Sequence, residues 1–166
     1  MLNPQQRDKS WIVEHIPHQG TMCLIDSVES WDTDFIQCRA SSHRDSDNPL
    51  RAFQQLSTAC GIEYAAQAMA IHGALLAPVG SELPKSGYLV SIRSTKLHVV
   101  RLDDIDADLE IEATCLARTN NDVLYQFKVS ATGQLLLDGR AAVVLSVEAP
   151  SLSSTRSSTN ASGDNL

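Results

Sequence analysis

The segment between Arg51 and Glu82 most constrains how this chain can fold, because it contains only one charged side chain, Glu63. It also holds seven alanines after Ser57. A capping residue at its start and Pro78 at its end predict a helix over roughly Ser57–Leu76. A helix that is narrow and apolar nearly all round is usually buried. We therefore expect this helix to lie inside a sheet that wraps around it.

Apolar and polar residues alternate over residues 108–147, as they do in half-buried strands. Turn motifs at 119–122 and 131–134 divide this region into three strands, the last from Leu135 to Val147. Earlier strands are expected over Met22–Trp31, Phe35–Ala40 and Gly87–Val100. The order ββ–α–ββββ predicts an α+β hotdog fold, in which a curved antiparallel sheet wraps one long central helix.

The chain has 166 residues, which suits one domain. Only 5% of residues are aromatic, so the core must be mainly aliphatic. The last 16 residues, from Ser151, are rich in Ser, Thr and Asn and cannot bury enough surface to offset the entropy of ordering. We expect a single hotdog domain at 1–150 and a disordered tail at 151–166.

Charge and cysteine content exclude several classes of protein. Twenty acidic against 13 basic residues give a net charge of −7, so generic nucleic-acid binding is not expected. No signal peptide and no membrane-spanning run is recognisable. The four cysteines form no CxxC pair, which argues against a zinc site or a disulfide framework. We expect a soluble cytoplasmic protein without a metal or other cofactor and without a membrane partner.

The single charge of the helix is the first candidate for chemistry. Gln67 lies four residues after Glu63 and so on the same helix face. A buried carboxylate must find donors or stay protonated, and a carboxylic acid held in that way can act as a general acid or base. The alternative is that Glu63 only supports the helix N-terminus, where the dipole stabilises an anion.

Three motifs resemble the β-hydroxyacyl-ACP dehydratases of the hotdog fold. The run Ile16–Asp26 resembles their PHR-x-P-x-LL-x-D opening, and Gly61–Ala68 resembles their glutamate-bearing central helix. Gly87–Leu89 with Lys96-Leu97 matches the start of their third strand. The helix, with its IEYxAQAMAxHG pattern, is most similar to the divergent dehydratase-like subunits of aryl-polyene gene clusters. The resemblance covers roughly residues 10–147.

This resemblance implies a double-hotdog dimer with an acyl tunnel at the subunit interface. One subunit supplies a histidine that takes the α-proton, and the other supplies a glutamate, here Glu63, that protonates the departing hydroxyl. The backbone N–H of Gly61 would polarise the thioester carbonyl. His18, in the PH motif, is expected to be structural. His72, about 13 Å further along the helix than Glu63, is expected to pack or to close the tunnel.

The chain departs from the family where the catalytic histidine is expected, because that region reads Asp47-Asn48-Pro49-Leu50. Asn48 can orient a substrate but cannot abstract a proton. His43, five residues earlier, is the candidate substitute within the chain. Our leading hypothesis is that a second hotdog protein supplies the histidine in a hetero-oligomer. The assembly itself is expected to be a homodimer or a heterodimer with a second hotdog subunit, or a higher oligomer.

The predicted function is that of a dehydratase, or a dehydratase subunit, acting on 3-hydroxyacyl thioesters of an acyl carrier protein in fatty-acid or polyene-type synthesis. Arg93, Lys96 and Arg101 form the most basic stretch and could dock an acidic carrier protein. Two alternatives remain open. One is a hotdog thioesterase that uses Glu63 with the amide of Asn48 or Gln67, and the other is a non-catalytic partner of an active hotdog subunit.

Overall fold

A computed structural model describes residues 5–78 and 87–145 of the chain. The helices are α1 (Lys9–His15) and α2 (Gly61–Leu76), with 3-10 turns at Gly20–Met22, Ser42–Arg44 and Thr58–Cys60. The strands are β1 (Ser27–Trp31), β2 (Phe35–Ala40), β3 (Gly87–Leu97), β4 (Leu109–Arg118), β5 (Asp122–Ala131) and β6 (Gln134–Leu145). The predicted tail at 151–166 lies outside the described residues. No helix in the described ranges is both long enough and apolar enough to span a bilayer.

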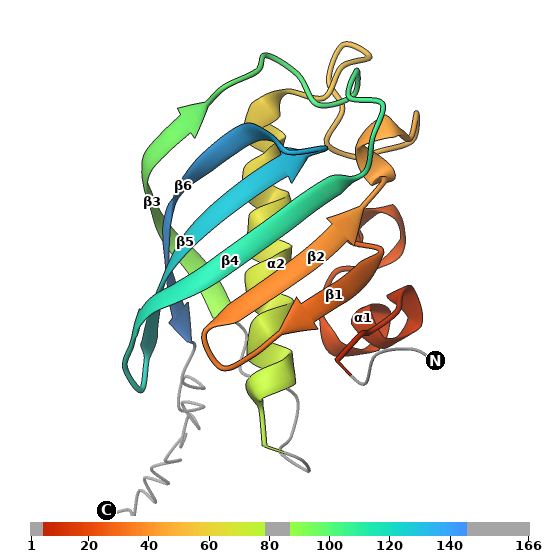
Figure 1. The fold of residues 1–166 in the computed structure, drawn as a ribbon. Coiled ribbons are helices and arrows are strands. Elements are labelled where there is room, and N and C mark those ends of the chain that lie inside the picture. The colour runs from red at the N-terminus through yellow and green to blue at the C-terminus, as the bar shows by residue number, and fades with distance from the viewer. Residues whose placement is uncertain (1–4, 79–86, 146–166) are drawn as a thin grey trace, which may run out of the picture.

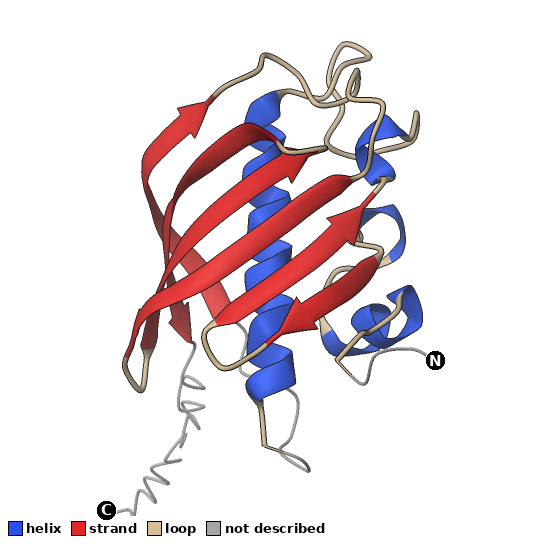
Figure 2. Ribbon diagram, viewed as in Figure 1, coloured by secondary structure: helices blue, strands red, loops and turns tan. Residues whose placement is uncertain are grey.

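The six strands form one antiparallel sheet in the order β1-β2-β4-β5-β6-β3. The sheet curves around α2, which crosses its concave face (Figures 1 and 2). This arrangement confirms the predicted hotdog fold, with one long helix held inside a curved sheet. The short helix α1 lies beside β1, at the end of the sheet opposite β3 (Figure 1).

Element boundaries differ from the prediction mainly where the chain turns. The central α-helix starts at Gly61 because residues 58–60 form a 3-10 turn, and the Ser57 hydroxyl accepts a hydrogen bond from Ala59 N there. The first strand starts at Ser27 rather than at Met22, since Gly20–Met22 is also a 3-10 turn. Helix α1 was not predicted; the Asp8 side chain caps it by accepting a hydrogen bond from Trp11 N.

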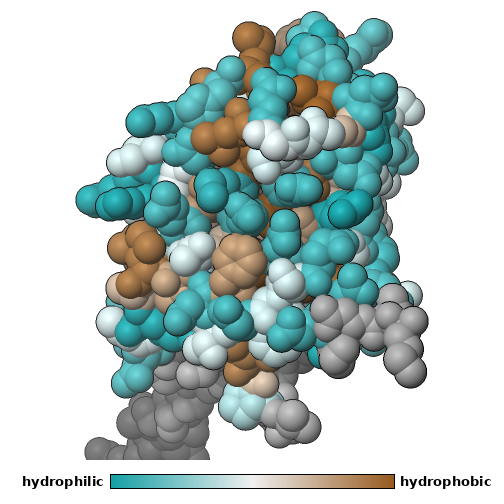
Figure 3. Space-filling view, in the orientation of Figure 1, coloured by the Kyte–Doolittle hydropathy of each residue, from teal (hydrophilic) through white to brown (hydrophobic). Residues whose placement is uncertain are grey.

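The core lies between α2 and the concave face of the sheet. Side chains of β5 alternate between buried and exposed along most of the strand, and Val123, Tyr125, Phe127 and Val129 point inward as predicted. Half of the helix residues are buried, Tyr64 among them. The outer face of the sheet is mostly hydrophilic with scattered hydrophobic patches (Figure 3). Only one side of the sheet therefore contributes to the core, as the strand periodicity predicts.

Candidate active site

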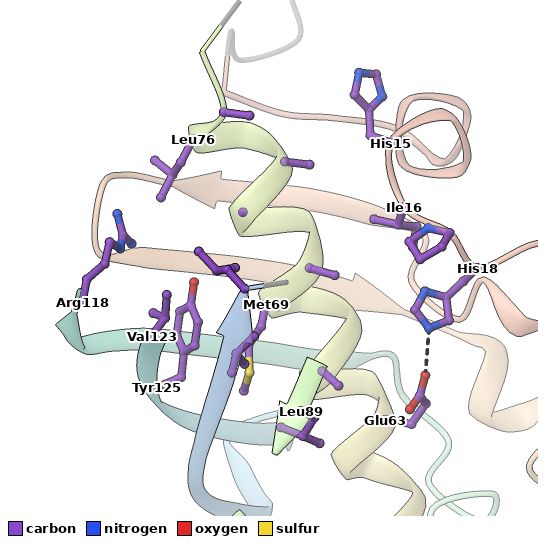
Figure 4. A pocket seen from close by; sticks show the side chains of 18 of the residues that line it. His15, Ile16, His18, Glu63, Met69, Leu76, Leu89, Arg118, Val123 and Tyr125 are labelled. Carbon is purple, nitrogen blue, oxygen red and sulfur yellow. Dashed lines mark ion pairs between the residues drawn. The ribbon is translucent and has the colours of Figure 1, made fainter. Parts of the chain in front are cut away.

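A cavity of about 550 Å³ runs along α2. It is bounded by the helix, by residues 15–18 at the end of α1, and by side chains of β3, β4, β5 and β6 (Figure 4). Small residues of the helix open this space, because alanine and glycine leave room beside the helix backbone. Most of the wall is apolar, formed by side chains such as Ile16, Ala66, Met69, Ala70, Leu76, Val123 and Val143.

Glu63 is the only carboxylate among the described residues that line this cavity. Its Oε1 lies 3.2 Å from His18 Nε2 and accepts a hydrogen bond of 3.1 Å from Gln67 Nε2. The side chain is 34% exposed, so the carboxylate is neither fully buried nor unpaired. Glu63 is therefore held by two neighbours while still facing the cavity (Figure 4).

Gln67 ties the helix to the chain segment that carries His18. Its Nε2 also donates to the Met22 carbonyl at 2.7 Å, and its Oε1 accepts from Leu24 N at 2.9 Å. The side chain is completely buried. Since residues 22–24 are anchored in this way, the loop before them passes beside the first turns of α2. Gln67 thus acts as a support for the Glu63 site.

His18 is the histidine that the structure brings to Glu63. Its side chain is 27% exposed, and its Nδ1 has no hydrogen-bond partner among the described residues. His18 was predicted to be structural only, because 45 positions separate it from Glu63 and no local pattern links the two residues. The PH motif was the signal available, and it carried no information about which side chain His18 would meet.

The structure places His43 and Asn48 away from this cavity. His43 is fully buried, its Nε2 lies 3.0 Å from the Ile105 carbonyl, and burial lowers its pKa. Asn48 donates to the Ser42 carbonyl at 2.9 Å and to the Tyr64 hydroxyl at 3.1 Å. Asn48 thus contacts the first turns of α2 through Tyr64, whereas His43 contacts the segment around Ile105, and neither side chain lines the cavity.

The backbone N–H of Gly61 is already hydrogen-bonded within the chain. This N–H donates to the carbonyls of Thr58 and Ala59, because the 3-10 turn continues directly into α2. The residue is buried, and a Cβ built on it would lie 2.5 Å from Leu137 Cδ2. In this conformation the Gly61 N–H therefore has no free hydrogen to offer a thioester carbonyl, and Gly61 is not among the cavity-lining residues.

The predicted docking residues separate into two groups. Arg93 and Lys96 are exposed on β3, on either side of an irregularity in its pairing with β6. Arg101 instead forms ion pairs with Asp103 and Asp104, and the Asp103 carboxylate is nearly buried. This pairing lowers the pKa of the Asp103 carboxyl. Arg101 thus already has acidic partners within the chain.

The fold and the site define a hotdog-fold protein with one carboxylate in the wall of an apolar cavity along its central helix. The ApeP-like family, described as ApeP dehydratase, matches residues 11–153 of the chain. The chain belongs to this family of dehydratases and dehydratase subunits. No curated protein matches it.

Several solved structures share the fold. The dehydratase heterocomplex ApeI:P from Xenorhabdus doucetiae has a chain with a TM-score of 0.73 and 20% identity, and the match covers 82% of this chain and 91% of that one. A thioesterase from Pseudomonas aeruginosa matches with a TM-score of 0.57, 13% identity, and 88% and 100% coverage. A thioesterase from Haemophilus influenzae matches with a TM-score of 0.54, 16% identity, and 81% coverage of both chains.

Proposed function

We propose that the chain is a dehydratase subunit that acts on 3-hydroxyacyl thioesters of an acyl carrier protein, with Glu63 as the general acid. The observation that carries this proposal is the placement of Glu63 in the wall of an otherwise mainly apolar cavity. Such a cavity suits an acyl chain, since apolar walls take up apolar chains. The carboxylate would then lie beside the reacting end of that chain.

The proposed reaction removes water from the β-hydroxyacyl group. A base takes the α-proton, the C–O bond at the β-carbon breaks, and the Glu63 carboxyl gives its proton to the departing hydroxyl. A carbon–carbon double bond forms between the α- and β-carbons. We propose that a second hotdog subunit supplies the base as a histidine, because His43 is buried at another place and Asn48 cannot abstract a proton. The heterocomplex nature of ApeI:P supports a partner of this kind.

His18 has a supporting role in this proposal. Its Nε2 lies within hydrogen-bond distance of Glu63 Oε1, so the imidazole orients the carboxyl group together with Gln67. Arg93 and Lys96 are our candidates for contact with the acidic carrier protein, because both are exposed on the same strand. Like charges on the carrier and the subunit would otherwise repel, given the net charge of −7.

The test is dehydration of a 3-hydroxyacyl carrier protein, followed by absorbance and mass spectrometry, for the chain alone and with its hotdog partner. We expect turnover only in the complex and a loss of about 10²- to 10⁴-fold in Glu63→Gln. Full activity of the Glu63→Gln complex would assign the chain a non-catalytic role. Release of free acid would instead identify a thioesterase.

Turnover by the chain alone would contradict the partner histidine and would place the base within this chain. The variants His18→Gln and His43→Gln then locate it. Loss in His18→Gln alone would point to the imidazole beside Glu63, whereas loss in His43→Gln alone would require the loop at 41–48 to move.

A further inference from the structure

Two arginines face each other on the neighbouring strands β3 and β6. Arg93 and Arg140 lie directly opposite in the antiparallel ladder, so their side chains leave the same face of the sheet. This is the outer face, because Gly139 and Ala141 on either side of Arg140 are buried while both arginines are exposed. Like charges in this relation destabilise a sheet unless an anion lies beside them.

Neither guanidinium is neutralised within the part of the chain that the structure describes. No acid there forms an ion pair with Arg93 or Arg140, and no carbonyl accepts a hydrogen bond from either side chain. Each of the other arginines in these ranges has an acid or a carbonyl within reach. The pair is therefore an exception in a chain whose net charge is −7, and it indicates an acid from another molecule.

The position of the pair at an edge of the sheet indicates the kind of molecule. Strand β3 ends the sheet and pairs only with β6 among the described strands (Figure 1). Its other side can therefore pair with a strand of another subunit. Leu89, Val90 and Leu97 are exposed along the same strand. A second hotdog subunit, which has an edge strand of its own, fits this surface.

An identical copy of the chain fits it poorly. Two copies of one strand pair around a twofold axis, and antiparallel pairing over all eleven residues of β3 puts Ile92 at that axis. Arg93 then lies opposite Ser91 of the copy and diagonally beside the Arg93 of the copy, at about 7–8 Å. With Arg140 of each chain on the next strand, four guanidinium groups share one face of the joined sheet.

We propose that the Arg93–Arg140 pair disfavours the pairing of β3 with an identical chain and favours a second hotdog subunit that presents a carboxylate at this place. The carboxylate accepts hydrogen bonds from the guanidinium groups and neutralises them, whereas a second copy adds two more cations. The inference rests on the proposed function in one respect, namely that a second hotdog subunit completes the site. The competing occupant is the acidic carrier protein, and the test separates the two.

The test is self-association of the purified full-length chain, measured by analytical ultracentrifugation at low salt for the unmodified chain, Arg93→Gln and Arg140→Gln. We expect each variant to self-associate about three- to tenfold more tightly, because each removes two of the four clustered cations of the dimer. Raising the salt concentration to about 0.5 M should remove most of this difference, since repulsion between exposed charges is then screened.

Asn120→Asp is the matched control. It makes the net charge one unit more negative, as each arginine variant does, but at an exposed position in the turn between β4 and β5. Repulsion between two acidic chains as a whole would make all three variants self-associate more weakly. Repulsion within the arginine cluster makes only the two arginine variants self-associate more tightly. The sign of the change therefore distinguishes the local effect from the effect of net charge.

Binding to the hotdog partner should change in the opposite direction. We expect Arg93→Gln and Arg140→Gln to bind this partner about three- to tenfold more weakly at low salt, because each loses a charged donor to the carboxylate. Since both positions are exposed and are changed separately, misfolding of one variant leaves the other informative.

Self-association that is weaker or unchanged in both arginine variants would overturn the proposal, and an unchanged value would leave the pair to the carrier protein. Variants that all remain monomeric would overturn it too, because another feature would then keep the copies apart. Undiminished binding of both variants to the hotdog partner would overturn the predicted carboxylate. The dehydration assay on Glu63→Gln is a separate readout, so failure of the proposed function is recognised independently of the self-association result.

Discussion

At the scale of single residues, the Gln67 side chain at the Glu63 site makes hydrogen bonds to Glu63, to the Met22 carbonyl and to the Leu24 N–H. Replacing it by leucine would leave the buried Leu24 N–H and the partly buried Met22 carbonyl without these hydrogen bonds. We expect Gln67→Leu to lower the free energy of unfolding by about 2–4 kcal/mol, measured by urea denaturation. Gln126→Leu, at an exposed position on β5, is the control and should change it little. Equal losses in the two variants would contradict the role of Gln67.

Two buried histidines predict how stability depends on pH. Burial lowers the pKa of both His43 and His72 below the ordinary value of 6.5, so the unfolded chain binds protons that the folded chain does not. Stability is therefore constant above about pH 6.5 and falls as the pH drops below it, by up to about 1.4 kcal/mol per pH unit for each histidine.

Urea denaturation between pH 7.5 and pH 5 checks this dependence, with the pH values chosen to bracket the ordinary histidine pKa of about 6.5. In His43→Gln the slope should be shallower, since one of the two groups is gone. A slope that does not change in this variant would show that His43 is not one of the responsible groups. Stability that rises toward pH 5 would contradict the expected direction for both.

At the scale of the elements, the two glycines of α2 should respond oppositely to alanine. A Cβ at Gly61 would meet Leu137 at 2.5 Å, and Leu137 is fully buried and cannot easily give way. A Cβ at Gly73 would meet nothing within 4 Å. We expect Gly61→Ala to destabilise the protein by about 1–3 kcal/mol, and Gly73→Ala to stabilise it by about 0.5–1 kcal/mol through helix propensity.

Thermal denaturation of the two variants measures both effects in the same helix. Each variant is the control for the other, because the chemical change is identical and only the surroundings differ. Stabilisation by Gly61→Ala would mean that Leu137 moves aside at little cost, and the close approach of α2 to β6 would then not be a constraint on the fold.

At the scale of the whole molecule, the edge strand β3 is the surface best suited to pair with a strand of another subunit. It ends the sheet, and among its exposed side chains are Leu89, Val90 and Leu97 at 39%, 60% and 50% exposure. An apolar edge strand promotes pairing with another strand. We expect the chain to associate through β3, and Val90→Lys to shift it toward the monomer in analytical ultracentrifugation. Leu124→Lys, on the outer face of β5, should leave the association unchanged.

The other edge of the sheet is covered within the chain. Arg7 pairs with Val28 of β1, and α1 follows directly after this pairing. The two edges therefore differ, which is why we assign association to β3. Equal effects of Val90→Lys and Leu124→Lys on the sedimentation coefficient would remove that assignment.

The hotdog fold could be read from the amino-acid sequence because its signals are local. The single charge among the residues of α2 indicates a buried helix, and alternation along β4 and β5 indicates strands with one buried face. Each signal depends on neighbours within a few positions. The helix α1 was missed, since its short run of seven residues has only one fully buried side chain, Ile12.

Which side chains surround Glu63, in contrast, depends on tertiary contacts between segments that are far apart in the sequence. That Glu63 is the one charge of the central helix is evident from the order of the amino acids. Which of the five histidines faces Glu63 depends on packing, because Gln67 anchors a segment 43 residues earlier and so brings His18 to the carboxylate. The same holds for Tyr125, His72 and Arg118, which three different elements bring together. Contacts of this kind follow from packing between distant segments, and no spacing along the chain encodes them.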